Sequence, residues 1–103
     1  MAMEENNYIS SLHNPKLKRI VQLQEKSRNR KKEGVFVVEG QREIELLLQA
    51  NYHIESYYYC EEFLDESFIK KLKQSSVITF QLNKTAYQKI AYRGSTEGIM
   101  AIV

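Results

Sequence analysis

The spacing of apolar residues predicts four helices. After Asn14-Pro15, apolar residues recur with helical spacing to about Lys26. Asn is a favoured helix cap, and Pro fits the first turn, where no backbone donor is needed. Three further helices are predicted, over residues 41–50 (with Asn51 as terminator), 65–73 (capped by Asp65) and 83–91 (capped by Asn83).

Short apolar stretches between these segments predict strands. Val35–Val38 is a continuous apolar run, which predicts a strand buried on both faces, as in the middle of a parallel sheet. His53–Cys60 is rich in β-formers, with Ile54, Tyr58 and Cys60 expected on one face. Two more strands are predicted over 77–80 and 99–103, whereas 27–34 lacks helical apolar spacing and is predicted to be a loop.

Strands that alternate with helices at this spacing predict an α/β fold. Right-handed βαβ connections would give a mostly parallel sheet covered by helices on both faces. With 103 residues the chain is expected to be one domain over 9–103, preceded by a mobile tail over 1–8. It has one cysteine, no long apolar segment and no signal-peptide pattern. We therefore expect a cytoplasmic protein that does not enter membranes.

Charge is unevenly distributed along the chain. Residues 16–32 contain eight Lys or Arg and one acid, Glu25, although the formal net charge is only +2. The rest is acidic on balance, with a cluster at Glu61, Glu62, Asp65 and Glu66. Such sorting favours an anionic partner, above all nucleic acid. The alternative is an ordinary solvated helix face followed by a flexible basic loop.

The candidate RNA-binding residues surround the predicted strand over 35–38. They are the cations of the first helix, of the predicted basic loop and of the next helix, together with the Glu39-Gly40 corner: Lys16, Arg19, Lys26, Arg28, Arg30, Lys31, Lys32, Glu39, Gly40 and Arg42. Arg suits paired contacts with phosphate, and Lys adds a less directional charge. Gly40 allows a tight turn from strand to helix, and ligands of α/β sheets bind at such corners.

Glu39 admits two interpretations. It can pair with Arg30 or Arg42, or accept hydrogen bonds from ribose hydroxyls or base amines. Alternatively, it only caps the following helix and orients an arginine. A helix N-terminus favours phosphate, but a carboxylate beside it repels one.

Other candidate chemistry is sparse. Tyr57, Tyr58 and Tyr59 would be able to stack on unpaired bases, but alternation turns Tyr58 opposite to its neighbours, and at least one is expected in the core. His13 and His53 lack neighbouring ligands at zinc spacing, and Cys60 is expected to be a buried small hydrophobe. The sequence contains no Ser-His-Asp pattern and no phosphate-binding Gly-rich loop.

Short motifs in order along the chain resemble a known family. They are Ile9, Ser10, Asn14-Pro15, Lys16, Lys18, Leu23 and Lys26; Arg30, Phe36, Val38 and Glu39-Gly40; and Ser95-Thr96-Glu97-Gly98-Ile99 with Ala101. In this order they resemble the N-terminal substrate-binding domain of SpoU (TrmH-like) RNA ribose 2′-O-methyltransferases. Members often have Gln where Glu97 stands.

The resemblance implies a three-layer α/β/α fold of the ribosomal protein L30e type. It implies an RNA-binding domain of an enzyme that methylates ribosomal RNA or transfer RNA, with ribosomal RNA favoured. S-adenosylmethionine, catalysis and homodimerisation would belong to a knotted domain absent from this chain. The chain alone would then be inactive, cofactor-free and monomeric. The alternatives are a stand-alone L30e-like RNA-binding module and, less favoured, a protein-interaction domain that docks through its acidic helix.

Overall fold

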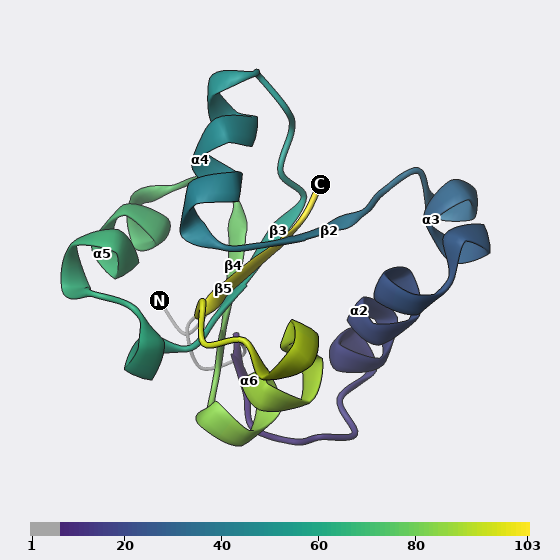
Figure 1. Ribbon diagram of the computed structural model, residues 1–103. Coiled ribbons are helices and arrows are strands. Elements are labelled where there is room, and N and C mark those ends of the chain that lie inside the picture. The colour runs from purple at the N-terminus through teal and green to yellow at the C-terminus, as the bar shows by residue number, and fades with distance from the viewer. Residues whose placement is uncertain (1–6) are drawn as a thin grey trace.

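The computed structural model describes residues 7–103, which form one five-stranded sheet between two layers of helices (Figure 1). The strand order is β1-β4-β3-β5-β2. The strands are β1 (Tyr8–Ile9), β2 (Val37–Glu39), β3 (Ser56–Tyr59), β4 (Ile78–Leu82) and β5 (Ile99–Ile102). The helices are α2 (Pro15–Glu25), α3 (Ser27–Glu33), α4 (Gln41–Gln49), α5 (Glu66–Gln74) and α6 (Lys84–Ile90), with 3₁₀ turns η1 (Glu61–Phe63) and η2 (Tyr92–Gly94).

Side-chain caps start three of the helices where the sequence predicts them. Asn14 Oδ1 accepts from the Lys16 N–H at 2.9 Å, Asp65 from that of Phe68 at 2.9 Å, and Asn83 from that of Ala86 at 2.8 Å. Each bond satisfies a backbone donor that has no partner within the helix. The predicted helices are confirmed to within a few residues.

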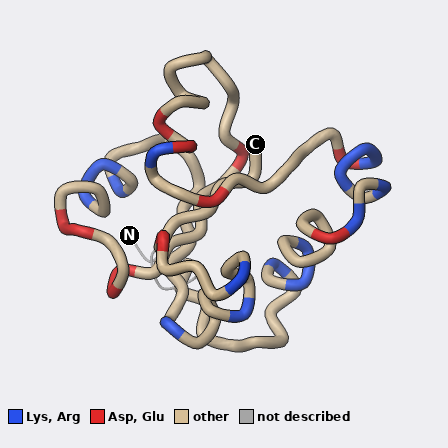
Figure 2. Tube along the Cα trace, viewed as in Figure 1, with Lys and Arg blue, Asp and Glu red and all other residues tan. Residues whose placement is uncertain are grey.

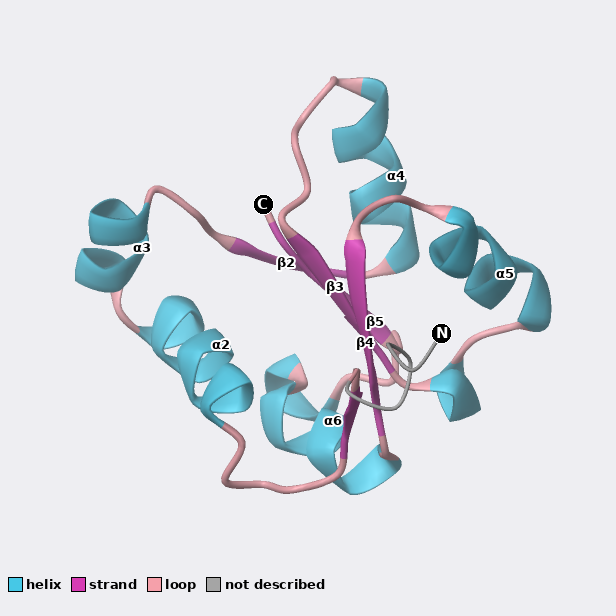
Figure 3. Ribbon diagram, turned by 180° about the vertical axis from the view of Figure 1, so that it is seen from behind, coloured by secondary structure: helices cyan, strands magenta, loops and turns pink. Residues whose placement is uncertain are grey.

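Each face of the sheet has its own core, so the predicted three-layer class is confirmed (Figure 3). Helices α2 and α6 cover one face, and α4 and α5 cover the other. Along β3, Tyr58 packs on the α2–α6 side, while Tyr57 and Tyr59 pack on the α4–α5 side. The prediction that Ile54 shares a face with Tyr58 and Cys60 is wrong. Ile54 precedes β3, where strict alternation does not hold, and packs on the α4–α5 side.

Strand β5 runs against the rest of the sheet. It pairs antiparallel with β3 and β2, whereas β1, β4 and β3 are mutually parallel, so four of the five strands run the same way. The predicted mostly parallel sheet is confirmed.

The expectation of a central strand at residues 35–38 is wrong. Within residues 7–103, strand β2 lies at the edge of the sheet with β5 as its only partner, and its three residues are half-buried. The strand is apolar because both of its faces are partly buried. A run of apolar residues looks the same in the sequence whether the strand is partly or fully buried. The register directs the main-chain N–H and C=O groups of alternate residues, Val37 and Glu39, away from β5.

The N-terminal boundary also differs from the expectation. Tyr8 belongs to β1 and pairs with Gln81 of β4, so the ordered fold begins before residue 9. Residues 1–6 of the expected tail lie outside the described part of the chain. Within residues 7–103, no helix combines the length and apolarity required of a membrane span.

The predicted basic loop is a helix. Residues Ser27–Glu33 form α3, which buries no residue and ends at Gly34 in a left-handed conformation (φ 70°). Gly34 donates its N–H to the Arg30 carbonyl at 2.8 Å. Helix α3 was not predicted because none of its faces packs against a core. Its sequence therefore lacks apolar residues at helical spacing. The signal for it was Gly34 after a turn rich in cations, which suits a helix C-terminus.

Candidate nucleic-acid interface

Two consecutive helices at one side of the molecule, α2 and α3, are rich in Lys and Arg (Figure 2). Within residues 7–103, five exposed cations on or between these helices make no hydrogen bond, ion pair or cation–π contact through their side chains. These are Lys18, Lys26, Arg28, Lys31 and Lys32, which we call the α2–α3 cationic surface. Three of the five come from α3, which carries charge without contributing to the core. This surface can meet a polyanion without first breaking a contact within the chain.

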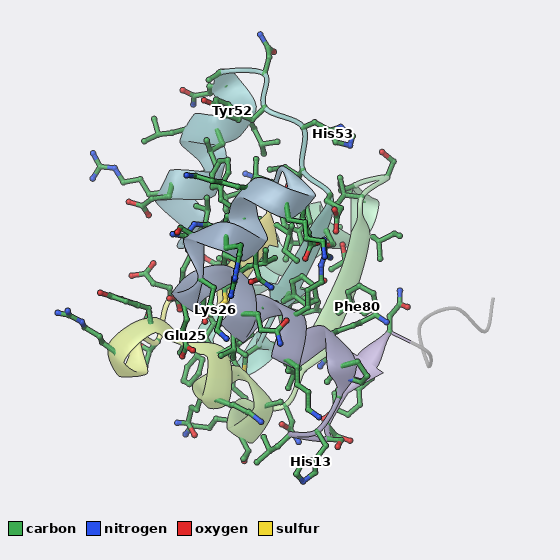
Figure 4. The ribbon with its side chains drawn as sticks, turned by 90° about the vertical axis from the view of Figure 1, so that its right-hand side faces the viewer. His13, Glu25, Lys26, Tyr52, His53 and Phe80 are labelled. Carbon is green, nitrogen blue, oxygen red and sulfur yellow. The ribbon has the colours of Figure 1, made fainter. Side chains whose placement is uncertain are left out.

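Lys26 marks the junction of the two helices. It has an extended backbone (φ −122°, ψ 109°) that serves as C-cap of α2 and N-cap of α3. Figure 4 views the molecule from this side and shows Lys26 beside Glu25 at the end of α2. The change of direction at this residue lets cations from both helices share one side of the protein.

Arg19 is engaged within the protein. Its guanidinium pairs with Glu33 at the end of α3 and with Glu55 before β3, both at 2.7 Å. The hydrogen bonds with Glu55 and then Glu33 raise the pKa of Arg19 above its ordinary value. Two carboxylates already balance its charge, so its predicted role is better filled by neighbouring cations.

Arg30 holds the two helices together. Its Nη1 donates to the carbonyl of Leu23 at 2.6 Å and to that of Gln24 at 3.1 Å, both in the last turn of α2. Those carbonyls lack partners within the helix, and a guanidinium suits them in charge and geometry. Arg30 therefore positions α3 and its exposed cations.

Lys16 lies at the opposite end of α2. Its Nζ stands 5.2 Å from the centroid of the Phe80 ring, a cation–π arrangement, while the residue remains exposed. Both residues line a hollow of about 390 Å³ beside β4. Lys16 is thus available to a ligand and fixed in position by an aromatic ring.

The carboxylate of Glu39 accepts hydrogen bonds from residues far along the chain. Its Oε2 accepts from the Tyr87 hydroxyl at 2.8 Å, and its Oε1 accepts from the Tyr92 N–H at 3.0 Å. Burial, and then the bond to Glu39, raise the pKa of Tyr87 well above its usual range. The expectation that Glu39 pairs with Arg30 or Arg42 is wrong, and so is the expectation of a helix cap, because Gly40 occupies that position without a side-chain bond. Neither the Tyr87 hydroxyl nor the Tyr92 N–H is foreseeable from the local sequence.

Gly40 makes the tight turn expected of it. Its φ of 117° suits only glycine, and an added Cβ would come 2.5 Å from Glu43 Oε1 and 3.2 Å from Glu97 Oε1. Two carboxylates therefore converge on the N-terminus of α4. This corner favours a ligand that brings hydrogen-bond donors, because phosphate would be repelled.

Arg42 is separated from the other predicted residues. It is exposed on α4, which covers the opposite face of the sheet from α2. The fold gathers Lys16, Lys26 and the exposed cations of α3 on one side and leaves Arg42 apart.

A pocket of about 620 Å³ opens between the edge strand β2 and the α2–α3 pair; we call it the corner pocket. Its walls are Leu23, Gln24, Arg30, Phe36, Val37, Glu39, Glu43, Tyr92, Ser95 and Glu97. The sequence analysis did not identify Tyr92, Glu43 or Glu97 as site residues. The sequence contained only weak signals for this pocket. They were a tyrosine next to Arg93-Gly94 and the position of Glu97 in the family-like motif.

The geometry does not support the other sites considered, namely base stacking on the β3 tyrosines, metal binding and a reactive cysteine. Tyr57, Tyr58 and Tyr59 are all 3–4% exposed, so none of them offers a ring to an unpaired base, and the expectation that at least one lies in the core is confirmed. His13 and His53 lie at opposite ends of the molecule (Figure 4). Among the described residues, no group of three or more His, Cys, Asp or Glu stands close enough to hold a metal ion. Cys60 is buried, and burial raises its thiol pKa.

Comparison with known proteins agrees with this arrangement of elements. The sequence profile of the MRM3-like substrate binding domain matches residues 14–101, nearly the whole described chain. The chain belongs to this family. The expected likeness to the SpoU/TrmH RNA 2′-O-ribose methyltransferases is thereby confirmed. No protein of curated function matches the sequence.

Solved structures similar to this MRM3-like domain are larger proteins. An RNA 2′-O ribose methyltransferase matches with a TM-score of 0.76 and 26% identity, over 92% of this chain and 36% of its own length. An rRNA methyltransferase from Sinorhizobium meliloti matches with a TM-score of 0.75 and 19% identity, over 92% and 35%. The SpoU methyltransferase AviRb from Streptomyces viridochromogenes matches with a TM-score of 0.71 and 18% identity, over 87% and 32%. The chain thus spans about a third of each.

Proposed function

We propose that this chain is the RNA-binding, substrate-recognition domain of an S-adenosylmethionine-dependent RNA 2′-O-ribose methyltransferase that acts in the cytoplasm. Ribosomal RNA is the favoured substrate, with transfer RNA as the alternative. The similar solved structures described as RNA and rRNA methyltransferases support the enzyme class. The observation that carries the proposal is the α2–α3 cationic surface, with five exposed cations that make no side-chain ion pair or hydrogen bond within residues 7–103.

The physical reason is counterion release. RNA carries condensed counterions, and each phosphate that a lysine or arginine neutralises frees some of them, which drives binding. An arginine and two lysines on seven-residue α3, beside Lys18 on α2 and Lys26 at the junction, can follow a phosphate backbone. A stand-alone RNA-binding module would use the same surface, so this feature supports RNA binding in either case.

A protein-interaction domain is less well supported. The acidic cluster before and at the start of α5 is exposed, but the same helix carries exposed Lys70, Lys71 and Lys73. The charge there is mixed within two turns, whereas α2 and α3 keep a strong cationic excess. A mixed surface is typical of an ordinary solvated helix.

The test replaces Arg28, Lys31 and Lys32 with glutamine together. Binding of a fluorescein-labelled RNA hairpin would be followed by fluorescence polarisation between about 50 and 200 mM salt. Each lost phosphate contact lowers the log–log salt slope by about 0.7 to 0.9, so loss of three contacts should lower it by about 2. Affinity at low salt should fall in parallel.

The matched control replaces Lys70, Lys71 and Lys73 with glutamine. It removes the same charge from α5, in the opposite helical layer, and should leave the slope nearly unchanged. If both triple variants weaken binding equally, only net charge matters. The proposed surface would then be wrong, provided that both variants melt like the parent protein.

The cofactor and the assembly belong to the same proposal. The chain spans about a third of each similar methyltransferase, so we assign S-adenosylmethionine to the remaining part of the enzyme. We therefore expect this chain to bind no cofactor, to have no activity alone and to be monomeric, with dimerisation left to the rest of the enzyme. Calorimetry with the cofactor should show only heat of dilution, and sedimentation at micromolar concentration should show one monomeric species.

A further inference from the structure

The corner pocket combines an exposed aromatic ring with two carboxylates that have no hydrogen bond or ion pair within residues 7–103. Tyr92 is 62% exposed and lines the pocket together with Glu43 and Glu97. Arg30, which positions α3, lines the same pocket. The pocket is thus continuous with the helix that carries the densest positive charge.

Tyr92 is held in place although it is exposed. Its N–H donates to the Glu39 carboxylate at 3.0 Å, and Glu39 is bound in turn by the buried Tyr87 hydroxyl. The next residue, Arg93, adopts a left-handed conformation (φ 52°) that is uncommon for a residue other than glycine. Its guanidinium carbon lies 5.1 Å from the centroid of the Tyr92 ring. A fixed backbone thus presents an aromatic face stacked with a cation, which suits an unpaired base.

Both carboxylates belong to exposed residues, so a ligand that enters the pocket can reach them. Glu43 and Glu97 both approach Gly40, and within residues 7–103 neither side chain has an ion pair or hydrogen bond. These residues are not part of a metal-binding group in the described chain. An ionised carboxylate only accepts hydrogen bonds, so a neutral ligand for this pocket must offer donors.

Guanine is the RNA base that fits this requirement. Its N1–H and 2-amino group are adjacent donors on one edge and can bind a carboxylate through two parallel bonds, with a second amino hydrogen left for another acceptor. In adenine, cytosine and uracil, each donor on that edge is flanked by ring nitrogens or carbonyl oxygens that a carboxylate repels. We propose that the corner pocket binds one unpaired guanine of the RNA, stacked on Tyr92 and held at its N1–H and 2-amino group by Glu97 and Glu43. The inference rests on the proposed RNA-binding function and deepens it.

The test uses short fluorescein-labelled oligouridines that carry one central guanosine, inosine or adenosine. Inosine keeps the N1–H and lacks the 2-amino group, so it probes one donor without any change to the protein. The guanosine oligomer should bind about tenfold more tightly than the adenosine oligomer, which is typical of one bidentate base contact, with inosine between them. Equal affinity of the parent protein for all three would overturn the inference.

Variants assign the preference to residues. Glu97→Gln combined with Glu43→Gln should remove the preference for guanosine. Tyr92→Ala should weaken all three oligomers by about fivefold or more, and Tyr92→Phe should retain their affinity, because stacking needs the ring and not the hydroxyl. A guanosine preference that survives the double glutamine variant would place the base elsewhere. Thermal unfolding of each variant checks the fold.

Failure of this inference is distinguishable from failure of the proposed function. If the oligomers bind equally well but lose affinity in the Arg28, Lys31 and Lys32 variant, guanine recognition is wrong and RNA binding by α3 stands. If the parent protein binds neither the oligomers nor the hairpin, both are wrong.

Discussion

Helices α2 and α3 follow one another along the chain and carry the same sign of charge, yet the fold holds them in different ways. Helix α2 buries Leu17, Ile20 and Leu23, each without solvent exposure, in the core it shares with α6. Helix α3 buries no residue and is joined to α2 by Arg30 and by the salt bridge of Glu33 with Arg19.

The difference shows which residues are free to serve a partner. On α2, the apolar positions are fixed by packing, and one of its cations, Arg19, is already balanced by carboxylates. Within residues 7–103, Arg30 and Glu33 are the only residues of α3 whose side chains make a hydrogen bond or ion pair with the rest of the fold. Packing does not account for the cations at Arg28, Lys31 and Lys32, which is why we assign them to RNA.

The largest expected effect on stability comes from α2. Ile20→Ala removes a fully buried side chain and should lower the free energy of unfolding by about 2 to 5 kcal/mol. Leu46→Ala on α4 is the matched control, because Leu46 is 55% exposed, and a change within about 0.5 kcal/mol is expected. Urea denaturation measures both. If both variants lowered the free energy of unfolding by similar amounts, burial would not explain the stability contributed by these two positions.

An intermediate effect is expected at the joint between the helices. Arg30→Gln removes the bonds to Leu23 and Gln24 and should cost about 1 to 2 kcal/mol, since Arg30 is only half-buried. Amide hydrogen exchange should accelerate in α3 more than in α5. Unchanged exchange in α3 would show that Arg30 does not hold this helix. Arg30→Lys keeps the charge but loses the planar donor group, so it should recover little of the protection.

The smallest effect on stability is expected from the cations of α3. Glutamine at Arg28, Lys31 and Lys32 should change the free energy of unfolding by no more than about 0.5 kcal/mol, because the three side chains are exposed. The same variant is expected to show the large loss of RNA affinity described above. A loss of stability comparable to that of Ile20→Ala would mean that these cations support the fold.

Elements whose signals are local were predictable from the amino-acid sequence. Asn14, Asp65 and Asn83 predicted three helix starts because a capping side chain bonds to backbone two or three residues away. Gly40 predicted a tight turn because its conformation excludes other residues. The uneven charge over residues 16–32 predicted a cationic side, since the two helices are consecutive.

Features that depend on residues far apart in the sequence are set by packing and were not predictable. The burial of Tyr57, Tyr58 and Tyr59 together requires β3 to lie inside a sheet covered on both faces. Strand β2 stands at the edge because, among the described strands, it pairs with β5 alone. Helix α3 forms without apolar spacing because α2 carbonyls and Gly34 complete its contacts. Glu39 meets Tyr87, 48 residues away, and so fixes Tyr92 at the corner pocket. Such contacts arise when the chain packs, so a local pattern of residues does not encode them.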